Sequence, residues 1–476
     1  MNYNSVILRY GEIGLKSDRN RKYFETLYLS AIKEALKNFK NIKIISYGKR
    51  FIIYHEESNQ FIKLLKKIPG IQGFSPSFYF EFKTKQELIK EVFNQTQNLI
   101  KNKTFRITTK RVGHNHDFSS MDLAMEIGKE LEPLSKGVDL NNPDINIHLE
   151  IRNNLCHIYY ESFDGVGGLP PTSAGKVLAL FSGGIDSPVA AYQFLKRGCT
   201  VDFIYINLLG DAPFNELAKV YNELINNYVY GYIPKLYVVN AEDLVEKLKS
   251  EVDGTLRQIF LKIIFYKISE IIANKNKYIA IVTGEAVSQK SSQTLLSLKV
   301  IDSQVNTMVL RPLIGMDKIE ITKIAREIGT FSLSEKVKEY CNLSEGPVTT
   351  NPTLDVLKKL PDIENLIQEA IKNTIIFKGK LNIDETPKQE FKDAIIVDIR
   401  SEEKRKLKPI NSEINIEYPE ILHNFDKFSK DKKYIIVCDF GMKSLDVANK
   451  LSKKQINAIP KSIKEILKEP THFCQR

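Results

Sequence analysis

Six residues, SGGIDS at 182–187, form the stretch of this sequence that is best suited to chemistry. They follow the apolar run VLALF at 177–181 and lead directly into a helix-like segment, SPVAAYQFLKRG at 187–198. Glycines let a backbone approach a ligand closely, and the free N–H groups at a helix N-terminus favour an anion. The hydroxyls of Ser182 and Ser187 add two further donors. The pattern therefore predicts a phosphate-binding turn.

The spacing in this turn excludes two common nucleotide motifs. It is not GxxxxGK[ST], so a Walker P-loop is absent, and it is not GxGxxG, the dinucleotide fingerprint. The structural alternative is a plain strand-to-helix turn that contains a glycine. Two glycines, two serines and an aspartate within six residues are more than such a turn needs, which favours a ligand site.

The cysteines are a second source of chemistry. There are five, widely separated and without a CxxC pair, at 156, 199, 341, 438 and 474. This pattern argues against a disulfide framework and against a four-cysteine zinc site. Cys438 differs from the rest because it ends the apolar run YIIV and precedes DFGMKS and a helix. Backbone N–H groups and a helix N-terminus in such a loop would lower the pKa of the thiol and stabilise its anion.

The elements that position these residues begin with two α+β segments. Residues 1–60 read as strand, helix, strand, strand, and residues 61–170 mix three helices with three strands. The expected helices and strands of the second segment lie at 61–68, 86–100, 104–112, 121–131, 145–152 and 155–162. The glycine- and proline-rich stretch at 164–175 then predicts a domain boundary and a ligand-facing loop.

Residues 171–375 have a different pattern, because strands and helices alternate from 176 to about 345. The strands are nearly continuous apolar runs, which is typical of a parallel sheet covered on both faces, and predicts a doubly wound domain. A polar connector at 377–393 leads to a small last domain at 390–476, with strands at 394–400 and 434–440 and a helix at 444–454. The predicted fold class is an α/β multidomain protein.

Composition and charge narrow the class further. The chain has 476 residues, of which 42% are hydrophobic and 27% charged, as in soluble globular proteins. We expect a cytoplasmic protein without a membrane segment, because no apolar run nears 18 residues and the first 20 residues lack a signal-peptide block. Residues 1–111 hold 22 Lys and Arg against 9 Asp and Glu, a balance of +13, so a net charge of +11 leaves −2 for the other 365 residues. A basic front end favours nucleic-acid binding, the alternative being a lysine-rich proteome.

The SGGIDS turn resembles the pyrophosphate loop of the ATP pyrophosphatases (PP-loop enzymes), which split ATP into AMP and pyrophosphate while adenylating a substrate. Other segments resemble the 4-thiouridine synthetase family, which thiolates uridine 8 of tRNA. These segments are DGVGGLPPTSAGKVLALFSGGIDSPVAAY at 164–192, VTGEAVSQKSSQTLLSLKVID at 282–302, VLRPLIGMDKIEITKIAREIGT at 309–330 and EYC at 339–341. The segment at 105–131 resembles a THUMP domain, and IIVDIRSEEKRKLKP with IIVCDFGMKSLDVANKL resembles the rhodanese domain that some members carry.

The resemblance implies an N-terminal ferredoxin-like domain, a THUMP domain, a PP-loop domain and a small rhodanese-like domain. It also implies an ATP site at Leu180, Phe181, Ser182, Gly183, Gly184, Ser187, Tyr205, Ile206, Lys262, Gly284 and Gln293, with Tyr205 and Ile206 at the adenine. Asp186 matches the loop aspartate that acts through magnesium on phosphate oxygens. Lys318 matches a lysine required for adenylation, where a cation offsets charge as pyrophosphate leaves. No other metal is expected.

The resemblance implies a sulfur route as well. Cys438 matches the cysteine that accepts persulfide sulfur from a cysteine desulfurase. Cys341 matches the partner that attacks the persulfide and is left in a disulfide with Cys438. Cys156, Cys199 and Cys474 match no functional position and are expected to be structural.

The tRNA is expected on the basic front end and the THUMP-like segment, with Arg106, Lys110 and Arg111 as candidate contacts. Two residues depart from the family pattern. Lys443 stands where an arginine is often found, and Lys290 stands where a small apolar residue is usual. Whether the chain forms a homodimer, and which desulfurase serves it, are left open.

Three other functions compete with this one. The chain could be another PP-loop enzyme, such as a different tRNA thiolase or an amide-forming synthetase, although the THUMP-like segment argues against a purely small-molecule substrate. It could be a sulfur carrier for thiamin thiazole assembly, alone or alongside tRNA thiolation. It could also be an RNA-binding module with a decayed catalytic site, against which SGGIDS, Lys318, Cys341 and Cys438 all count.

Overall fold

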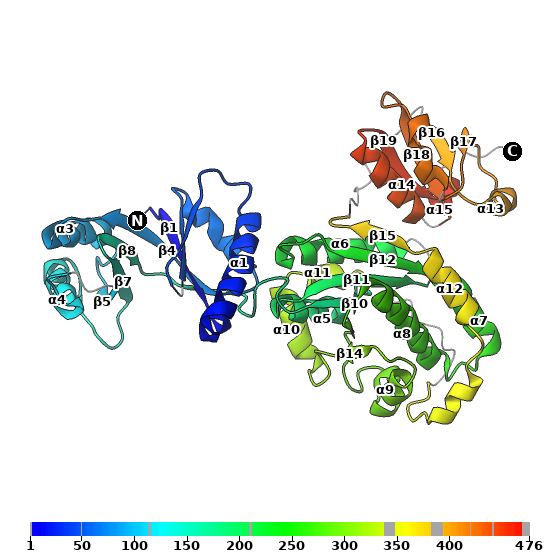
Figure 1. Ribbon diagram of the computed structural model, residues 1–476, viewed down its shortest axis with the longest axis horizontal. Coiled ribbons are helices and arrows are strands. Elements are labelled where there is room, and N and C mark those ends of the chain that lie inside the picture. Colours follow the sequence, from blue (N-terminus) through cyan, green and yellow to red (C-terminus); the bar gives the residue numbers. More distant parts are fainter. Residues whose placement is uncertain are drawn as a thin grey trace. The chain divides into compact units, whose positions relative to one another are not determined.

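A computed structural model describes residues 2–48, 50–112, 116–208, 212–337, 348–381, 394–418, 420–439 and 442–468 (Figure 1). The chain divides into two compact units, Met1–Ala174 with Leu195–Cys199, and Gly175–Phe194 with Thr200–Arg476. Within the described ranges, no helix has both the length and the apolar character needed to cross a membrane. The predicted α/β multidomain class is confirmed.

The first unit is built on one nine-stranded sheet, with the order β2-β3-β1-β4-β8-β7-β5-β6 and β9 paired to β4. Its strands are β1 (Ser5–Tyr10), β2 (Lys43–Ser46), β3 (Arg50–Tyr54), β4 (Ile71–Glu81), β5 (Thr104–Val112), β6 (Gly137–Val138), β7 (Ile145–Arg152), β8 (Leu155–Tyr159) and β9 (Phe163–Asp164). Its helices are α1 (Asp18–Ala35), α2 (Ile62–Leu65), α3 (Lys85–Thr96) and α4 (Ser120–Leu131).

Strand β4 is the longest in this sheet, and the sequence did not lead us to expect it. Gly73 and Pro76 lie within it and read as turn signals, because proline cannot donate to a ladder. On one edge β4 pairs with β1 from Ile71 to Ser77, whereas on the other edge β9 reaches only Phe74 and β8 begins only at Phe78. Pro76 falls in the gap between these two partners, which lets the strand continue.

Helices α1, α3 and α4 pack against one face of this sheet, and the opposite face, against which none of these three packs, is the helix-free face. The side chains of Phe105, Ile147, Leu149 and Ile158 pack into one core with residues of α3 and α4. Residues of the opposite parity on the same strands, such as Lys110 and Glu150, therefore project from the other face, since side chains alternate along a strand. Arg9 of β1 and Arg50 of β3 lie opposite each other in the strand register. Their sequence neighbours Tyr10 and Phe51 face α1, so the two arginines project from the other face.

The second unit contains a six-stranded sheet with the order β14-β13-β10-β11-β12-β15, in which only β15 is antiparallel. Its strands are β10 (Lys176–Leu180), β11 (Thr200–Asn207), β12 (Lys235–Asn240), β13 (Ala280–Val282), β14 (Met308–Leu310) and β15 (Ile375–Lys378). Its helices are α5 (Asp186–Lys196), α6 (Ala212–Tyr228), α7 (Glu242–Glu251), α8 (Arg257–Asn276), α9 (Leu295–Asp302), α10 (Lys318–Glu327), α11 (Phe331–Ser334) and α12 (Glu364–Lys372). The predicted doubly wound sheet is confirmed.

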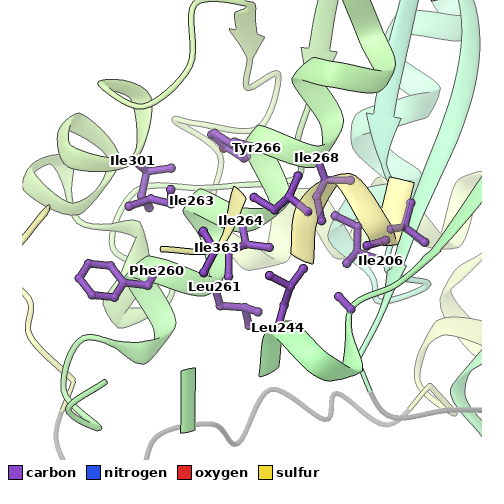
Figure 2. Packing of buried hydrophobic residues seen from close by; sticks show 14 of the residues in the cluster. Ile206, Leu244, Phe260, Leu261, Ile263, Ile264, Tyr266, Ile268, Ile301 and Ile363 are labelled. Carbon is purple, nitrogen blue, oxygen red and sulfur yellow. The ribbon is translucent and has the colours of Figure 1, made fainter. Parts of the chain in front are cut away.

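Each face of this sheet has its own helices. On one face Ile204 and Ile206 of β11 pack with α7, α8 and α12, and Figure 2 shows Leu261 and Tyr266 of α8 within this core. On the other face Phe203 contacts Tyr221 of α6 edge-on. Helix α8 carries buried apolar side chains all around its axis, which is typical of a helix inside a large core.

A four-stranded parallel sheet forms a separate layer at the end of the chain, with the order β17-β16-β18-β19. Its elements are β16 (Ile395–Asp398), α13 (Glu402–Leu407), β17 (Ile414–Asn415), β18 (Lys433–Cys438), α14 (Met442–Lys453), β19 (Asn457–Ser462) and α15 (Ile463–Lys468). The strand predicted at 434–440 is present as β18, which ends at Cys438, and the helix predicted at 444–454 is present as α14.

Candidate functional site

The SGGIDS turn connects β10 to α5 as the sequence predicts. The backbone N–H of Ser182 donates to Ser187 Oγ at 3.1 Å, which closes the turn. Gly183 has φ +75°, and a Cβ there would lie 3.0 Å from Leu217 Cα. A side chain at this position would therefore meet both a strained backbone and a close neighbour, so the turn requires glycine.

A second glycine brings another segment against the turn. Gly284 follows β13, and a Cβ at this position would lie 2.8 Å from the carbonyl carbon of Asp186 and 2.9 Å from Ser187 N. The backbone after β13 can approach the start of α5 only because residue 284 lacks a side chain. This contact places Thr283 and Glu285 beside the turn.

A cavity of about 200 Å³ opens at the carboxyl ends of β10 and β11, beside the turn. This is the position where doubly wound sheets bind their ligands. Apart from Gly183, every residue of the expected ATP site lines it, as does Asp186: Leu180, Phe181, Ser182, Gly184, Ser187, Tyr205, Ile206, Lys262, Gly284 and Gln293. The structure thus brings together residues that are more than 100 positions apart.

Part of the cavity wall is apolar and continuous with the core. Ile204, Ile206 and Leu261 line the cavity and also belong to the core around α8. Figure 2 shows Ile206 and Leu261 in that core. Such a surface suits a planar heterocycle, whereas the SGGIDS turn suits phosphates. Gln293 adds a polar group, because its Oε1 is buried and accepts no hydrogen bond within the described part of the chain.

Lys318 reaches the turn from α10. Its Nζ lies 2.5 Å from Asp186 Oδ1, and 48% of its side chain is exposed against 17% for Asp186. A capping box fixes the first turn of α10, in which Glu320 N donates to Asp317 Oδ1 at 2.8 Å and Asp317 N donates to Glu320 Oε2 at 3.0 Å. The lysine and the aspartate singled out from the sequence are therefore direct partners.

Glu285 is a cavity residue to which the sequence assigned no role. It is 1% exposed, and it forms ion pairs with Lys262, at 3.4 Å, and with Arg311, at 2.8 Å. Burial alone would raise the pKa of this carboxyl, but Lys262, the Tyr266 hydroxyl and Arg311 together hold it below its usual value. Its only signal in the sequence is an acidic residue directly after a buried strand and a glycine.

Cys438 lies at the end of β18, with 2% of its surface exposed. The backbone N–H of Ser444, near the start of α14, donates to its Sγ at 3.4 Å. The thiol is therefore next to a helix N-terminus, as expected. Nearby, Lys443 Nζ lies 5.3 Å from the ring centre of Tyr418. Cys341 lies outside the described residues, as does Cys474, whereas Cys156 and Cys199 are buried, and burial raises the pKa of both thiols.

The three predicted RNA contacts do not share one face of β5. Arg106 and Lys110 alternate onto the helix-free face, whereas Arg111 projects to the helix side and stacks over Phe118, 5.6 Å from the ring centre. Arg106 donates to the carbonyl of Leu140 at 3.0 Å. Side chains alternate between the two faces of a strand, so the sequence alone could have predicted that Arg111 lies on the face opposite to Arg106 and Lys110.

Lys110 belongs to a basic cluster that the sequence did not reveal, formed with Arg9, Arg50 and Arg152. The charge of Arg50 and then burial, with Arg152 and Arg9 adding to them, lower the pKa of Lys110, so like charges surround it. Arg50 and Arg152 both pair with the buried carboxylate of Glu150, and Arg152 Nη2 lies 2.7 Å from its Oε1. Arg9 lies over the ring of Tyr159, on which His148 stacks in parallel. The four cations lie on strands β1, β3, β5 and β7, which are far apart in the sequence.

Three family models match separate parts of the chain. A model described as the ThiI ferredoxin-like domain matches residues 5–75, the THUMP domain matches 82–161, and "Thiamine biosynthesis protein (ThiI)" matches 172–366. These matches confirm the predicted ferredoxin-like and THUMP domains. The final four-stranded layer lies beyond the residues that they cover.

Full-length relatives agree with these matches. The chain is 34% identical over 469 residues to the tRNA sulfurtransferase of Pyrobaculum aerophilum, an alignment that covers 95% of each chain. It is 36% identical over 370 residues to a probable tRNA sulfurtransferase of Sulfurisphaera tokodaii, which covers 77% of this chain and 98% of that one. A solved 4-thiouridine synthetase in complex with RNA and bound ATP is 29% identical, with a TM-score of 0.70 over 79% of this chain and 99% of that chain. The chain belongs to the ThiI family of tRNA sulfurtransferases.

Proposed function

We propose that this protein uses ATP to convert uridine 8 of tRNA to 4-thiouridine. One observation carries the proposal above the others: Asp186 and Lys318 meet at 2.5 Å beside a cavity that the expected ATP residues line. The bound ATP and RNA of the solved 4-thiouridine synthetase support the same assignment.

In the first step the nucleotide is activated for attack. The apolar wall at Ile204, Ile206 and Leu261 receives the adenine, and the SGGIDS turn with the N-terminus of α5 receives the phosphates. The uracil O4 attacks the α-phosphorus, the N3 proton passes to solvent, the bond to the β-phosphate breaks, and pyrophosphate leaves. Lys318 leaves its partner Asp186 and offsets the negative charge that builds up on the phosphates.

Magnesium fits this site only together with the nucleotide. Within the described residues no group of three or more His, Cys, Asp or Glu could bind a metal ion on its own. Magnesium in nucleotide sites is usually held by one or two carboxylates and by substrate phosphates, and Asp186 supplies one such carboxylate at the turn. When bound, the ion neutralises phosphate charge.

In the second step sulfur replaces the activated oxygen. A cysteine desulfurase loads Cys438 as a persulfide, whose terminal sulfur attacks C4 of the adenylated uracil and expels AMP. Cys341 then attacks the Cys438 sulfur, which releases 4-thiouridine and leaves a Cys341–Cys438 disulfide for reduction. The Ser444 N–H at 3.4 Å and the start of α14 stabilise an anion on Cys438. In this account residues 390–476 act as a rhodanese-like domain, after the domains at 1–60, 61–170 and 171–375.

The tRNA binds to the first unit. The basic cluster of Arg9, Arg50, Lys110 and Arg152 supplies closely spaced cations, and Arg106 lies on the same helix-free face as Lys110. Clustered cations repel one another in the free protein. Bound phosphates relieve this repulsion by supplying negative charge, so such a cluster favours the binding of a polyanion.

The two steps can be separated by mutation. The Cys438→Ala protein should release pyrophosphate in the presence of unmodified tRNA at a rate within about twofold of the wild type, and should form no 4-thiouridine from a persulfide donor. Cys156→Ala, also a buried cysteine, serves as the matched control and should keep both activities. Full 4-thiouridine formation by the Cys438→Ala protein would overturn the sulfur route.

Sulfur delivery for thiamin thiazole is a second candidate. It is favoured by the position of Cys438 in a sheet of its own, separate from the sheet that bears the ATP cavity. A persulfide on Cys438 could then serve a different acceptor without ATP. Sulfur transfer from the Asp186→Ala protein to a thiazole-forming enzyme would support it.

A further inference from the structure

The two oxygens of the Glu285 carboxylate have different surroundings. Oε2 accepts hydrogen bonds from the Tyr266 hydroxyl, from Thr283 Oγ1 at 3.1 Å and from Arg311 Nε at 2.8 Å. Oε1 is buried and accepts no hydrogen bond within the described part of the chain, but it lies 3.4 Å from Lys262 Nζ. One oxygen is therefore anchored and the other faces a lysine of the ATP cavity.

The anchor of Oε2 is rigid because its donors come from three places in the fold. Tyr266 lies on α8, Thr283 follows β13, and Arg311 follows β14. Arg311 is itself held by Asp302, with Nη1 3.0 Å from Oδ2 and Nη2 2.5 Å from Oδ1. With Oε2 held in this way, the carboxylate cannot turn, and Oε1 keeps its direction toward Lys262.

A purely structural role does not account for Oε1. Burying an ionised carboxylate is unfavourable unless both oxygens find partners, and a core would be better served by a neutral side chain. The group that compensates Oε1 is the ammonium of Lys262, whose side chain is 26% exposed and lines the cavity. The positive charge that neutralises Oε1 therefore lies at the wall of the ligand cavity and not in the core.

We propose that Glu285 is a positioning residue for nucleotide binding: it holds the ammonium of Lys262 at the cavity wall, ready for an anionic group of ATP, and Arg311 in turn holds Glu285. This inference rests on the proposed ATP site. It adds a residue that never needs to touch the nucleotide and acts through Lys262.

Glu285→Gln tests this arrangement with little change in volume. The amide oxygen must take the Oε2 position, because three donors point at it, so the amide NH₂ faces Lys262. Lys262 then loses its anionic partner, while the contacts of Tyr266, Thr283 and Arg311 survive. We expect the dissociation constant of a non-hydrolysable ATP analogue, measured calorimetrically with magnesium and the full-length protein, to rise about tenfold.

A double-mutant cycle with Lys262→Met separates positioning from simple loss of structure. If Glu285 acts through Lys262, Glu285→Gln should weaken binding no further in the Lys262→Met protein. Independent effects that multiply would overturn the inference. Should Glu285→Gln fail to fold, Arg311→Lys replaces it, with an expected loss of about threefold that also disappears in the Lys262→Met protein. A wild-type protein that binds no analogue would instead refute the ATP site itself.

Discussion

The cavity beside the SGGIDS turn and the basic cluster of the first unit are both rich in charge, but the charges are balanced in the first and in excess in the second. In and around the cavity, Lys262 pairs with Glu285, Arg311 with Glu285 and Asp302, and Lys318 with Asp186. In the basic cluster Arg50 and Arg152 share Glu150, and Lys110 has its pKa lowered first of all by the charge of Arg50. Compensated charges keep a defined geometry, which a reaction needs. Cations in excess attract a polyanion, which a tRNA-binding surface needs.

This difference has a consequence for mutagenesis. Removing one member of a compensated pair leaves a partner without its counter-charge, so effects in the cavity should be large and local. Removing one cation of the basic cluster should weaken binding modestly and change its dependence on salt.

The largest effect is expected at Lys318. Lys318→Ala should slow tRNA-dependent pyrophosphate release about 100- to 1000-fold, because a cation that stabilises the departing pyrophosphate is lost. Lys323→Ala, an exposed lysine on the same helix, is the matched control and should remain near the wild-type rate. Equal rates for the two variants, measured with saturating ATP and tRNA, would remove Lys318 from the reaction.

An intermediate effect is expected of pH on the stability of the first unit, through the buried side chain of His157. Burial, together with Arg152, lowers the pKa of His157 from 6.5 to about 4. The unfolded chain takes up a proton first as the pH falls below 6.5, so the free energy of unfolding should decrease between pH 6.5 and 4 and then level off. The loss should reach about 3 kcal/mol, or roughly 300-fold in the unfolding constant.

Hydrogen exchange of peptides from β1, β4 and β8, corrected for intrinsic rates, measures this loss in the full-length protein. Glu150 and Arg152 lie next to His157 in the sheet, so a His157→Gln protein is the necessary control. Its protection should be flat across the same pH range. An equally steep decrease in that variant would assign the pH dependence to other groups.

The smallest effect is expected on tRNA affinity. Lys110→Ala should weaken tRNA binding about three- to tenfold and reduce the slope of log K against log salt by about 0.7 to 0.9, the contribution of one phosphate contact. Arg111→Ala removes a neighbouring cation on the opposite face of β5 and should change the slope far less. Identical slopes for the two variants would contradict the assignment of the helix-free face.

Contiguous residues could be interpreted from the sequence, whereas residues that meet only in the fold could not. The SGGIDS turn was readable because its glycines, serines and Asp186 are contiguous, and the period of α5 follows at once. Lys318 and Asp186 were each assigned a role through a family resemblance, whereas their contact is a finding of the structure. Local patterns alone say nothing about groups that lie 132 residues apart.

The parts that were missed depend on tertiary contacts. Glu285 becomes informative only when α8, β13 and β14 bring Tyr266, Lys262 and Arg311 around it. The basic cluster requires β1, β3, β5 and β7 in one sheet, and that sheet depends on β4, whose Gly73 and Pro76 resemble a loop. Arg111 was grouped with Arg106 and Lys110 from sequence proximity, although alternation along β5 already predicts that Arg111 lies on the opposite face.

The central claim is that ATP consumption at the cavity and thiolation of tRNA are one coupled reaction. The most direct test incubates the full-length protein with unmodified tRNA, ATP, magnesium and a persulfide donor, then counts AMP, pyrophosphate and 4-thiouridine by mass spectrometry. We predict one AMP and one pyrophosphate for each 4-thiouridine, located at position 8, and no product when ATP is omitted or uridine 8 is replaced by cytidine. Thiolation without ATP, or ATP cleavage that never yields 4-thiouridine, would contradict the account.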